Sequence, residues 1–146
     1  MATNAKMGGA EGGLPHGHGT SDMGPTFEPV FRRADTLAEV PLAPGVSAQF
    51  LAGGRMMFSF VRLAPGGVVA DHAHPNEQMG YILEGSILLT VDGEEHDLQV
   101  GDAYAIPGGM THRGVGGPDG CLALDVFSPP REDYLARAAA AGAGDD

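Results

Sequence analysis

Three residues near the middle of the chain have side chains and spacing that suit a metal site. His72 and His74 are separated by one residue, and Gln78 follows four residues later. Side chains alternate between the two faces of a β-strand, so these three would share one face of an extended segment. Pro75 interrupts strict alternation. The segment therefore predicts part of a metal centre, with two imidazoles and an amide oxygen as ligands.

A second segment supplies another histidine. Together, the two segments resemble the paired motifs of the cupin superfamily, G-x5-H-x-H-x3,4-E-x6-G and G-x5-P-x-G-x2-H-x3-N. The first matches at Gly66, His72, His74, Gln78 and Gly85, and the second at Gly101, Pro107, Gly109 and His112. The resemblance extends over roughly residues 46–135. It implies a jelly-roll barrel in which His72, His74, Gln78 and His112 hold a metal ion.

The chain departs from these motifs at two positions. Gln78 stands where the first has Glu, and Gly116 stands where the second has Asn, which is not a ligand. Four neutral ligands leave the full charge on a divalent ion, which makes it a stronger Lewis acid. This favours non-redox chemistry on Zn, with Ni or Fe as alternatives. A competing interpretation is that the histidines are buried and hydrogen-bonded to the backbone.

The end of the predicted barrel carries further candidates for catalysis. Asp125 and Phe127 have the same parity, and Arg131 follows four residues later. This stretch resembles a cupin subgroup that acts on unsaturated, ring-opening uronate sugars, in which the matching residues line the active site. The resemblance implies that Asp125 is a general acid or base and Arg131 an anion binder. The alternative is an Asp125–Arg131 ion pair that only anchors the C-terminal segment.

Two tyrosines are candidates for contact with a substrate oxygen. Tyr81 and Tyr104 both lie in apolar runs, and we take Tyr81 as the third candidate catalytic residue. Tyrosines in barrel strands also serve as packing residues, so this alternative stays open for both.

The elements that must position these residues are short strands. The chain has 146 residues, of which 24 are Gly and 11 are Pro, which excludes long helices. Apolar runs bounded by Gly, Pro or Asp-Gly predict strands at 47–52, 55–63, 78–83, 86–91, 94–100 and 121–127. A helix is predicted at 131–141. Residues 1–26 form a Gly-rich arm, expected to be flexible, and 27–146 one all-β domain; His16 and His18 in the arm are given no role.

Charge and cysteine content exclude several classes of function. The formal net charge is −11, which disfavours nucleic-acid and membrane-surface binding. Cys121 is the single cysteine, and no apolar run approaches the length of a membrane span. We therefore expect a cytoplasmic protein that acts on a small molecule.

The site chemistry suits enolisation, and two substrate classes fit it. The chain is similar to cupin cyclases of aromatic polyketide pathways, which implies aldol ring closure of a poly-β-ketone. Met and Phe residues around the motifs predict an apolar pocket for such a substrate, so this is the first expectation. The alternative is a uronate-isomerising or ring-opening cupin. An Fe(II) dioxygenase and a non-catalytic binding cupin are further alternatives, and the resemblance implies a homodimer.

Overall fold

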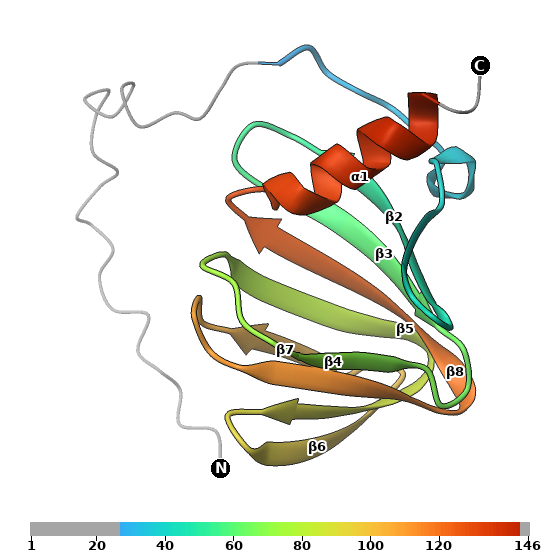
Figure 1. Cartoon of the computed structure of the whole chain (residues 1–146), viewed down its shortest axis with the longest axis vertical. Helices are drawn as coiled ribbons and strands as arrows, with labels where there is room; N and C mark the ends of the chain where they lie inside the picture. The colour runs from blue at the N-terminus through green and yellow to red at the C-terminus, as the bar shows by residue number, and fades with distance from the viewer. Residues whose placement is uncertain (1–26, 144–146) are drawn as a thin grey trace, which may run out of the picture.

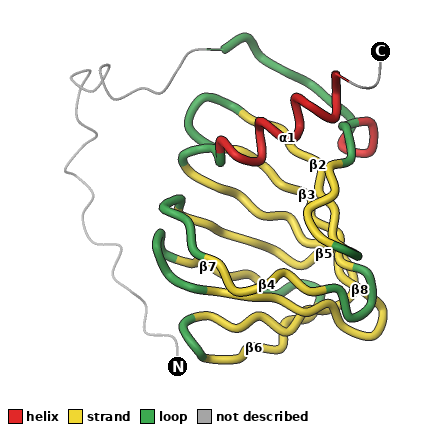
Figure 2. The backbone as a smooth tube through the Cα atoms, in the orientation of Figure 1, coloured by secondary structure: helices red, strands yellow, loops and turns green. Residues whose placement is uncertain are grey.

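The computed structural model describes residues 27–143, and the arm with His16 and His18 lies outside this range. Strands make up most of the described chain, and one helix follows them (Figures 1 and 2). The strands are β1 (Val40–Ala43), β2 (Val46–Ala52), β3 (Met57–Leu63), β4 (Val68–His72), β5 (Glu77–Val91), β6 (Glu94–Gln99), β7 (Ala103–Ile106) and β8 (His112–Ser128). The helix is α1 (Glu132–Ala143). No helix in this range is long and apolar enough to cross a membrane.

Two long strands, β5 and β8, run through both layers of the barrel. The first half of β5 and the second half of β8 pair with each other, and β7 and β3 flank them. Beyond the bend, the second half of β5 pairs with the first half of β8, and β6 and β4 flank those halves. Both strands therefore turn back on themselves, and their two ends meet at the same end of the barrel.

A glycine allows β5 to make this bend. The β5–β8 register shifts on both sides of Gly85, which has φ +70°. A Cβ on Gly85 would overlap the carbonyl oxygen of Gly120 in β8. A residue without a side chain satisfies both the backbone conformation and the close approach. The prediction of two separate strands at 78–83 and 86–91 is therefore wrong, because Gly85 bends one strand instead of ending it.

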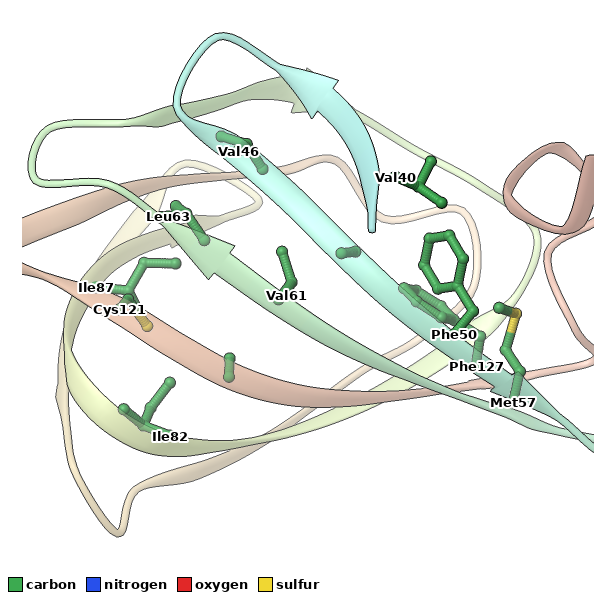
Figure 3. Packing of buried hydrophobic residues seen from close by; sticks show 12 residues of the cluster. Val40, Val46, Phe50, Met57, Val61, Leu63, Ile82, Ile87, Cys121 and Phe127 are labelled. Atoms are coloured by element: carbon green, nitrogen blue, oxygen red, sulfur yellow. The ribbon is translucent and has the colours of Figure 1, made fainter. Parts of the chain in front are cut away.

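The hydrophobic core fills the space between the layers. Phe50, Met57, Val61, Ile82 and Phe127 are among its buried side chains (Figure 3). Strands β2 and β3 show the period-two burial expected of strands with one covered face. The helix lies beside β1 and β2 and adds Tyr134, Leu135, Ala138 and Ala141 to the core (Figure 1).

The described residues form the all-β cupin-type barrel with a C-terminal helix that the sequence predicts. Its motif glycines lie where the backbone needs them: Gly66, Gly101 and Gly109 all have positive φ and sit in turns. Strands β1, β4 and β7 and the first half of β8 were not predicted. The first three are only four or five residues long, and the β8 segment contains Gly and Pro.

Candidate metal centre and active site

Three histidines meet where β4 ends and β8 begins. His72 is the last residue of β4 and pairs in register with His112, the first residue of β8. His74 lies in the loop between β4 and β5. The ligand nitrogens of the three side chains lie within 4.8 Å of one another, which is the spacing that a shared metal ion needs.

Each of these rings is oriented by its own backbone neighbourhood. The Nδ1 atoms donate to carbonyl oxygens two residues away: His72 to Ala70 at 2.9 Å, His74 to Asn76 at 3.1 Å and His112 to Met110 at 2.9 Å. A backbone carbonyl only accepts, so each neutral ring carries its proton on Nδ1. Every Nε2 is then left with a lone pair, as metal-binding histidines require.

Gln78, the second residue of β5, lies beside the histidine cluster. Its Oε1 lies 3.0 Å from His74 Nε2. Burial, with the nearby Arg131 charge, lowers the pKa of His74, so the ring is neutral near pH 7 and has a single N–H. That proton is used at Asn76, so two lone pairs face each other at Gln78. A cation between them resolves this conflict.

His112 is a second residue whose surroundings suit a bound cation. Its Nε2 is buried and has no hydrogen-bond partner among the described residues. Burial lowers the pKa of His112 to about 4, so the ring does not satisfy this nitrogen by taking up a proton at neutral pH. Three imidazole nitrogens and an amide oxygen fit a divalent ion such as zinc.

Hydrogen bonds from two other segments hold the loop that carries His74. The backbone N–H of Gly109 donates to His74 O at 2.7 Å, and Asn76 Nδ2 donates to Pro129 O at 2.6 Å. The strand-parity argument for His72 and His74 is thus wrong in its geometry, because β4 ends at His72. The loop, and not strand alternation, brings His74 to the cluster.

Asp125 lies one strand away from Gln78, on the inward face of β8. The carboxyl accepts a short hydrogen bond from the Tyr104 hydroxyl. Burial raises the pKa of Asp125 to about 6, although Tyr104, Gln78 and Arg131 act in the opposite direction. Burial and the neighbouring Asp125 also raise the pKa of Tyr104 well above 10. Asp125 therefore has the position and the proton affinity of a general base.

Arg131 reaches the same cavity from the segment that joins β8 to α1. Its guanidinium lies 3.7 Å from the centre of the Tyr134 ring, and Nη2 donates to Asp133 at 2.8 Å. Arg131 is only 9% exposed, and its Nη1 has no hydrogen-bond partner among residues 27–143. The alternative of an Asp125–Arg131 ion pair is not what the structure shows, because Asp133 is the carboxylate that Arg131 binds.

One cavity of about 60 Å³ joins these groups. His72, Gln78, His112, Asp125 and Arg131 all line it, and aliphatic residues from β3, β5 and β8 close its other sides. Tyr104 lines it as well. Sequence reasoning missed the importance of Tyr104, although its parity with buried Ile106 places it on the inward face.

Several residues expected at the site lie elsewhere. Tyr81 is 45% exposed on the outer face of β5, because its parity is opposite to that of Gln78. Phe127, which the resemblance places at the site, does line the cavity, whereas none of the Met and Phe residues expected to form its apolar wall does so. Met56, Phe58 and Met79 are exposed, Met57 is in the core, and Phe60 and Met110 are half-buried outside it.

Comparison with known proteins supports the barrel fold. The cupin domain family matches residues 59–127. Over 81 residues, the chain is 33% identical to the pectin degradation protein KdgF of Dickeya dadantii, covering 55% of this chain and 74% of that protein. The chain is a cupin.

This cupin also matches solved and curated relatives. The structure of KdgF from Halomonas sp. superposes with a TM-score of 0.70 and 27% identity, covering 74% of this cupin and 100% of that chain. The tetracenomycin polyketide synthase protein TcmJ of Streptomyces glaucescens is 34% identical over 74 residues, covering 50% of this cupin and 45% of that protein.

Proposed function

We propose that this cupin is a metal-dependent enzyme that opens the ring of a small unsaturated uronate and isomerises it to a keto acid. The observation that carries the proposal is Arg131 Nη1, a buried donor on the cavity wall that has no partner in the described part of the chain. A buried guanidinium N–H needs an acceptor, and a carboxylate is its preferred one.

The two unpartnered polar atoms suit one ligand. Among the described residues, the buried side-chain atoms without a partner are His112 Nε2 and Arg131 Nη1. The first suits a cation and the second an anion, and both residues line the same cavity. A sugar acid can meet both, because its carboxylate reaches Arg131 while its ring oxygens face the histidine cluster.

The residues of this chain have separate roles in the reaction. The three histidines and Gln78 would hold a divalent ion, which supplies Lewis acidity for the oxygen that becomes negative. Arg131 binds the carboxylate, and its stack on Tyr134 keeps the guanidinium in place. The aliphatic cavity walls exclude water, which strengthens these charge interactions.

Asp125 moves the proton. The carboxylate takes it from the hemiacetal hydroxyl, whose electrons form the aldehyde C=O as the ring C–O bond breaks. The electrons of that bond remain on the ring oxygen, which becomes an enolate. Asp125 then returns the proton to the alkene carbon, and the enolate becomes a ketone. The reaction is an isomerisation and needs no oxidant.

Polyketide ring closure is the second candidate, and TcmJ is the observation that favours it. The uronate proposal has more support. KdgF is matched over more of its length than TcmJ, and the methionines and phenylalanines expected to form a pocket for a polyketide lie outside the cavity.

The test compares a substrate with and without its carboxylate. Zinc-loaded protein is given an unsaturated monouronate and its methyl ester, and loss of the ultraviolet absorbance of the conjugated alkene is followed. We expect turnover of the acid, at least about 100-fold weaker kcat/KM for the ester, and a similar loss for Arg131→Gln with the acid. Equal rates for acid and ester would contradict the role of Arg131. Absence of turnover of both would contradict the proposed function.

A further inference from the structure

Three neighbouring strands place Tyr104, Gly80 and Asp125 in one row. In the register of the sheet, Tyr104 of β7 lies opposite Gly80 of β5, and Gly80 lies opposite Asp125 of β8. All three positions face the interior, in step with buried Gln78 and Ile82. Tyr104 and Asp125 are thus two strands apart, about 9–10 Å between backbones at the usual strand spacing.

The missing side chain of Gly80 lets the two outer residues meet. A Cβ placed on Gly80 would overlap the end of the Tyr104 ring, its hydroxyl and Asp125 Oδ1. The phenol therefore passes over Gly80 and donates to Asp125 Oδ1. Gly80 has no positive φ, so its backbone conformation does not demand a glycine. A glycine is required here because the Tyr104 ring and Asp125 occupy the space that a side chain would fill.

We propose that Tyr104 is a positioning residue for Asp125, reaching it through the gap over Gly80. The inference rests on the proposed role of Asp125 as the proton carrier. The phenol fixes one carboxyl oxygen and leaves the other to exchange protons with the substrate. The phenol O–H is the donor in this contact, and a carboxylate oxygen is the acceptor.

Gln78 lies beside the same carboxylate on the metal side of the cavity. Its amide oxygen faces His74, and the rest of the amide lies between this histidine and Asp125 on the cavity wall. An amide can serve both neighbours because it has an acceptor and a donor. A glutamate at this position would place a second carboxylate beside Asp125. The Tyr104–Asp125–Gln78 arrangement thus gives a physical reason for the departure from the cupin motif.

The kinetic test uses two tyrosines on opposite faces of the barrel wall. Tyr104→Phe keeps the ring and removes only the hydroxyl; Tyr81→Phe is the matched control. We expect Tyr104→Phe to lower kcat about 10- to 100-fold, with KM and zinc content unchanged. Tyr81→Phe should behave as the wild type. If Tyr104 only packs, Tyr104→Phe keeps the wild-type kcat, and that result overturns the proposal.

A double-mutant cycle tests the part played by Gly80. Gly80→Ala should lower kcat in the wild type by displacing the phenol and the carboxyl. In the Tyr104→Ala background there is room for the new methyl group, so Gly80→Ala should lower kcat much less. The fold-changes in kcat from the two single substitutions should therefore not multiply in the double variant. Gly142→Ala, whose Cβ meets nothing within 4 Å, is the control for a glycine replacement. If the fold-changes in kcat multiply, the claim that Tyr104 reaches Asp125 through the space above Gly80 is contradicted.

A measurement without substrate separates this proposal from the proposed function. A phenol proton hydrogen-bonded to a buried carboxylate gives a far-downfield proton NMR signal in the zinc-loaded protein. We expect one that is lost in both Tyr104→Phe and Asp125→Asn and kept in Tyr81→Phe. Its persistence in Tyr104→Phe would refute the Tyr104–Asp125 link, whatever the substrate is. If the signal disappears in Tyr104→Phe and Asp125→Asn as expected, but the wild type does not turn over the unsaturated uronate, only the uronate assignment is refuted.

Discussion

The inner and outer faces of β5 and β8 carry different kinds of residues, although these alternate along the same strands. Gln78 and Asp125 face inward and are 6% and 7% exposed, whereas Met79 and Tyr81 on the outer face are 56% and 45% exposed. The inner face carries buried polar side chains suited to binding a ligand, and the outer face carries exposed apolar side chains suited to a protein contact. Because side chains alternate along a strand, adjacent residues face the cavity and the outer surface in turn.

The outer face forms a continuous apolar patch, which we call the outer patch. In the strand register, Phe58 of β3, Val126 of β8 and Met79 of β5 lie side by side, and Leu124 and Tyr81 form the next row. No group in these rows is charged at neutral pH, although the chain carries a formal −11. Two copies can therefore meet here without burying like charges, so we propose the outer patch as a homodimer contact.

The largest expected effect is on the inner face, at the metal. His112→Ala removes one of three imidazoles, so zinc content and turnover should both fall to background. Zinc per protein is measured by mass spectrometry after dialysis. His96→Ala is the control, because His96 is an exposed histidine on β6 that pairs with Glu94. Full zinc occupancy in His112→Ala would contradict the ligand set.

A second inner-face change separates proton transfer from metal binding. Asp125→Asn should lower kcat by about 10²- to 10⁴-fold and leave zinc content unchanged. It should also stabilise the metal-free protein at pH 8. The raised pKa means that the folded state holds the Asp125 proton more tightly, so stability is lost as the pH rises from about 4 to about 6. A melting temperature at pH 8 that is unchanged or lower would contradict the cost of burying this carboxylate.

The outer face should respond differently. Met79→Glu puts a charge at the centre of the outer patch and should shift the protein from dimer to monomer in sedimentation, while zinc content stays at the wild-type level. Val100→Glu is the control, because Val100 is also exposed but lies in the turn after β6. A monomeric wild type, or a dimer that Met79→Glu leaves intact, would contradict this use of the outer patch.

The smallest expected effect is the dependence of kcat/KM on ionic strength, because the net charge of the protein is negative whereas Arg131 in the cavity is positive. The formal −11 repels an anionic substrate over long range, whereas Arg131 attracts it only inside the cavity. Raising the ionic strength from about 0.01 to 0.15 M shortens the Debye length from about 30 to 8 Å. We expect kcat/KM for the uronate to rise about two- to threefold, with kcat unchanged. A fall in kcat/KM would show that attraction dominates the encounter.

The meeting of the three histidines and Gln78 could be predicted from the sequence because their spacing is fixed by local structure. His72, His74, Gln78 and His112 lie close to turns whose glycines and proline have conformational requirements that are visible in the sequence. The positive φ angles of Gly66, Gly101 and Gly109 confirm these turns. The bend at Gly85 could not be predicted in the same way, because a glycine that ends a strand and one that bends it look alike in sequence.

Contacts between distant strands were the part that sequence reasoning missed. Tyr81 and Tyr104 are equally plausible candidates in the sequence. They are distinguished by the outward position of Tyr81 on β5, opposite to that of Gln78, and by the pairing of β7 with β5, which places Tyr104 inside. The preference of Arg131 for Asp133 over Asp125 depends on how the chain turns from β8 into α1. The Met and Phe residues near the motifs suggested an apolar pocket, but alternation places several of them outside.

The central claim is that a metal-bound inner face with Asp125 as the proton carrier isomerises an unsaturated uronate. The most direct measurement is the loss of alkene absorbance of the unsaturated monouronate with zinc-loaded wild type and with zinc-loaded Asp125→Asn. The account predicts rapid loss with the wild type and at least about 100-fold slower loss with the variant at equal zinc content. Equal rates for the two proteins, or a wild type no faster than buffer, would contradict it.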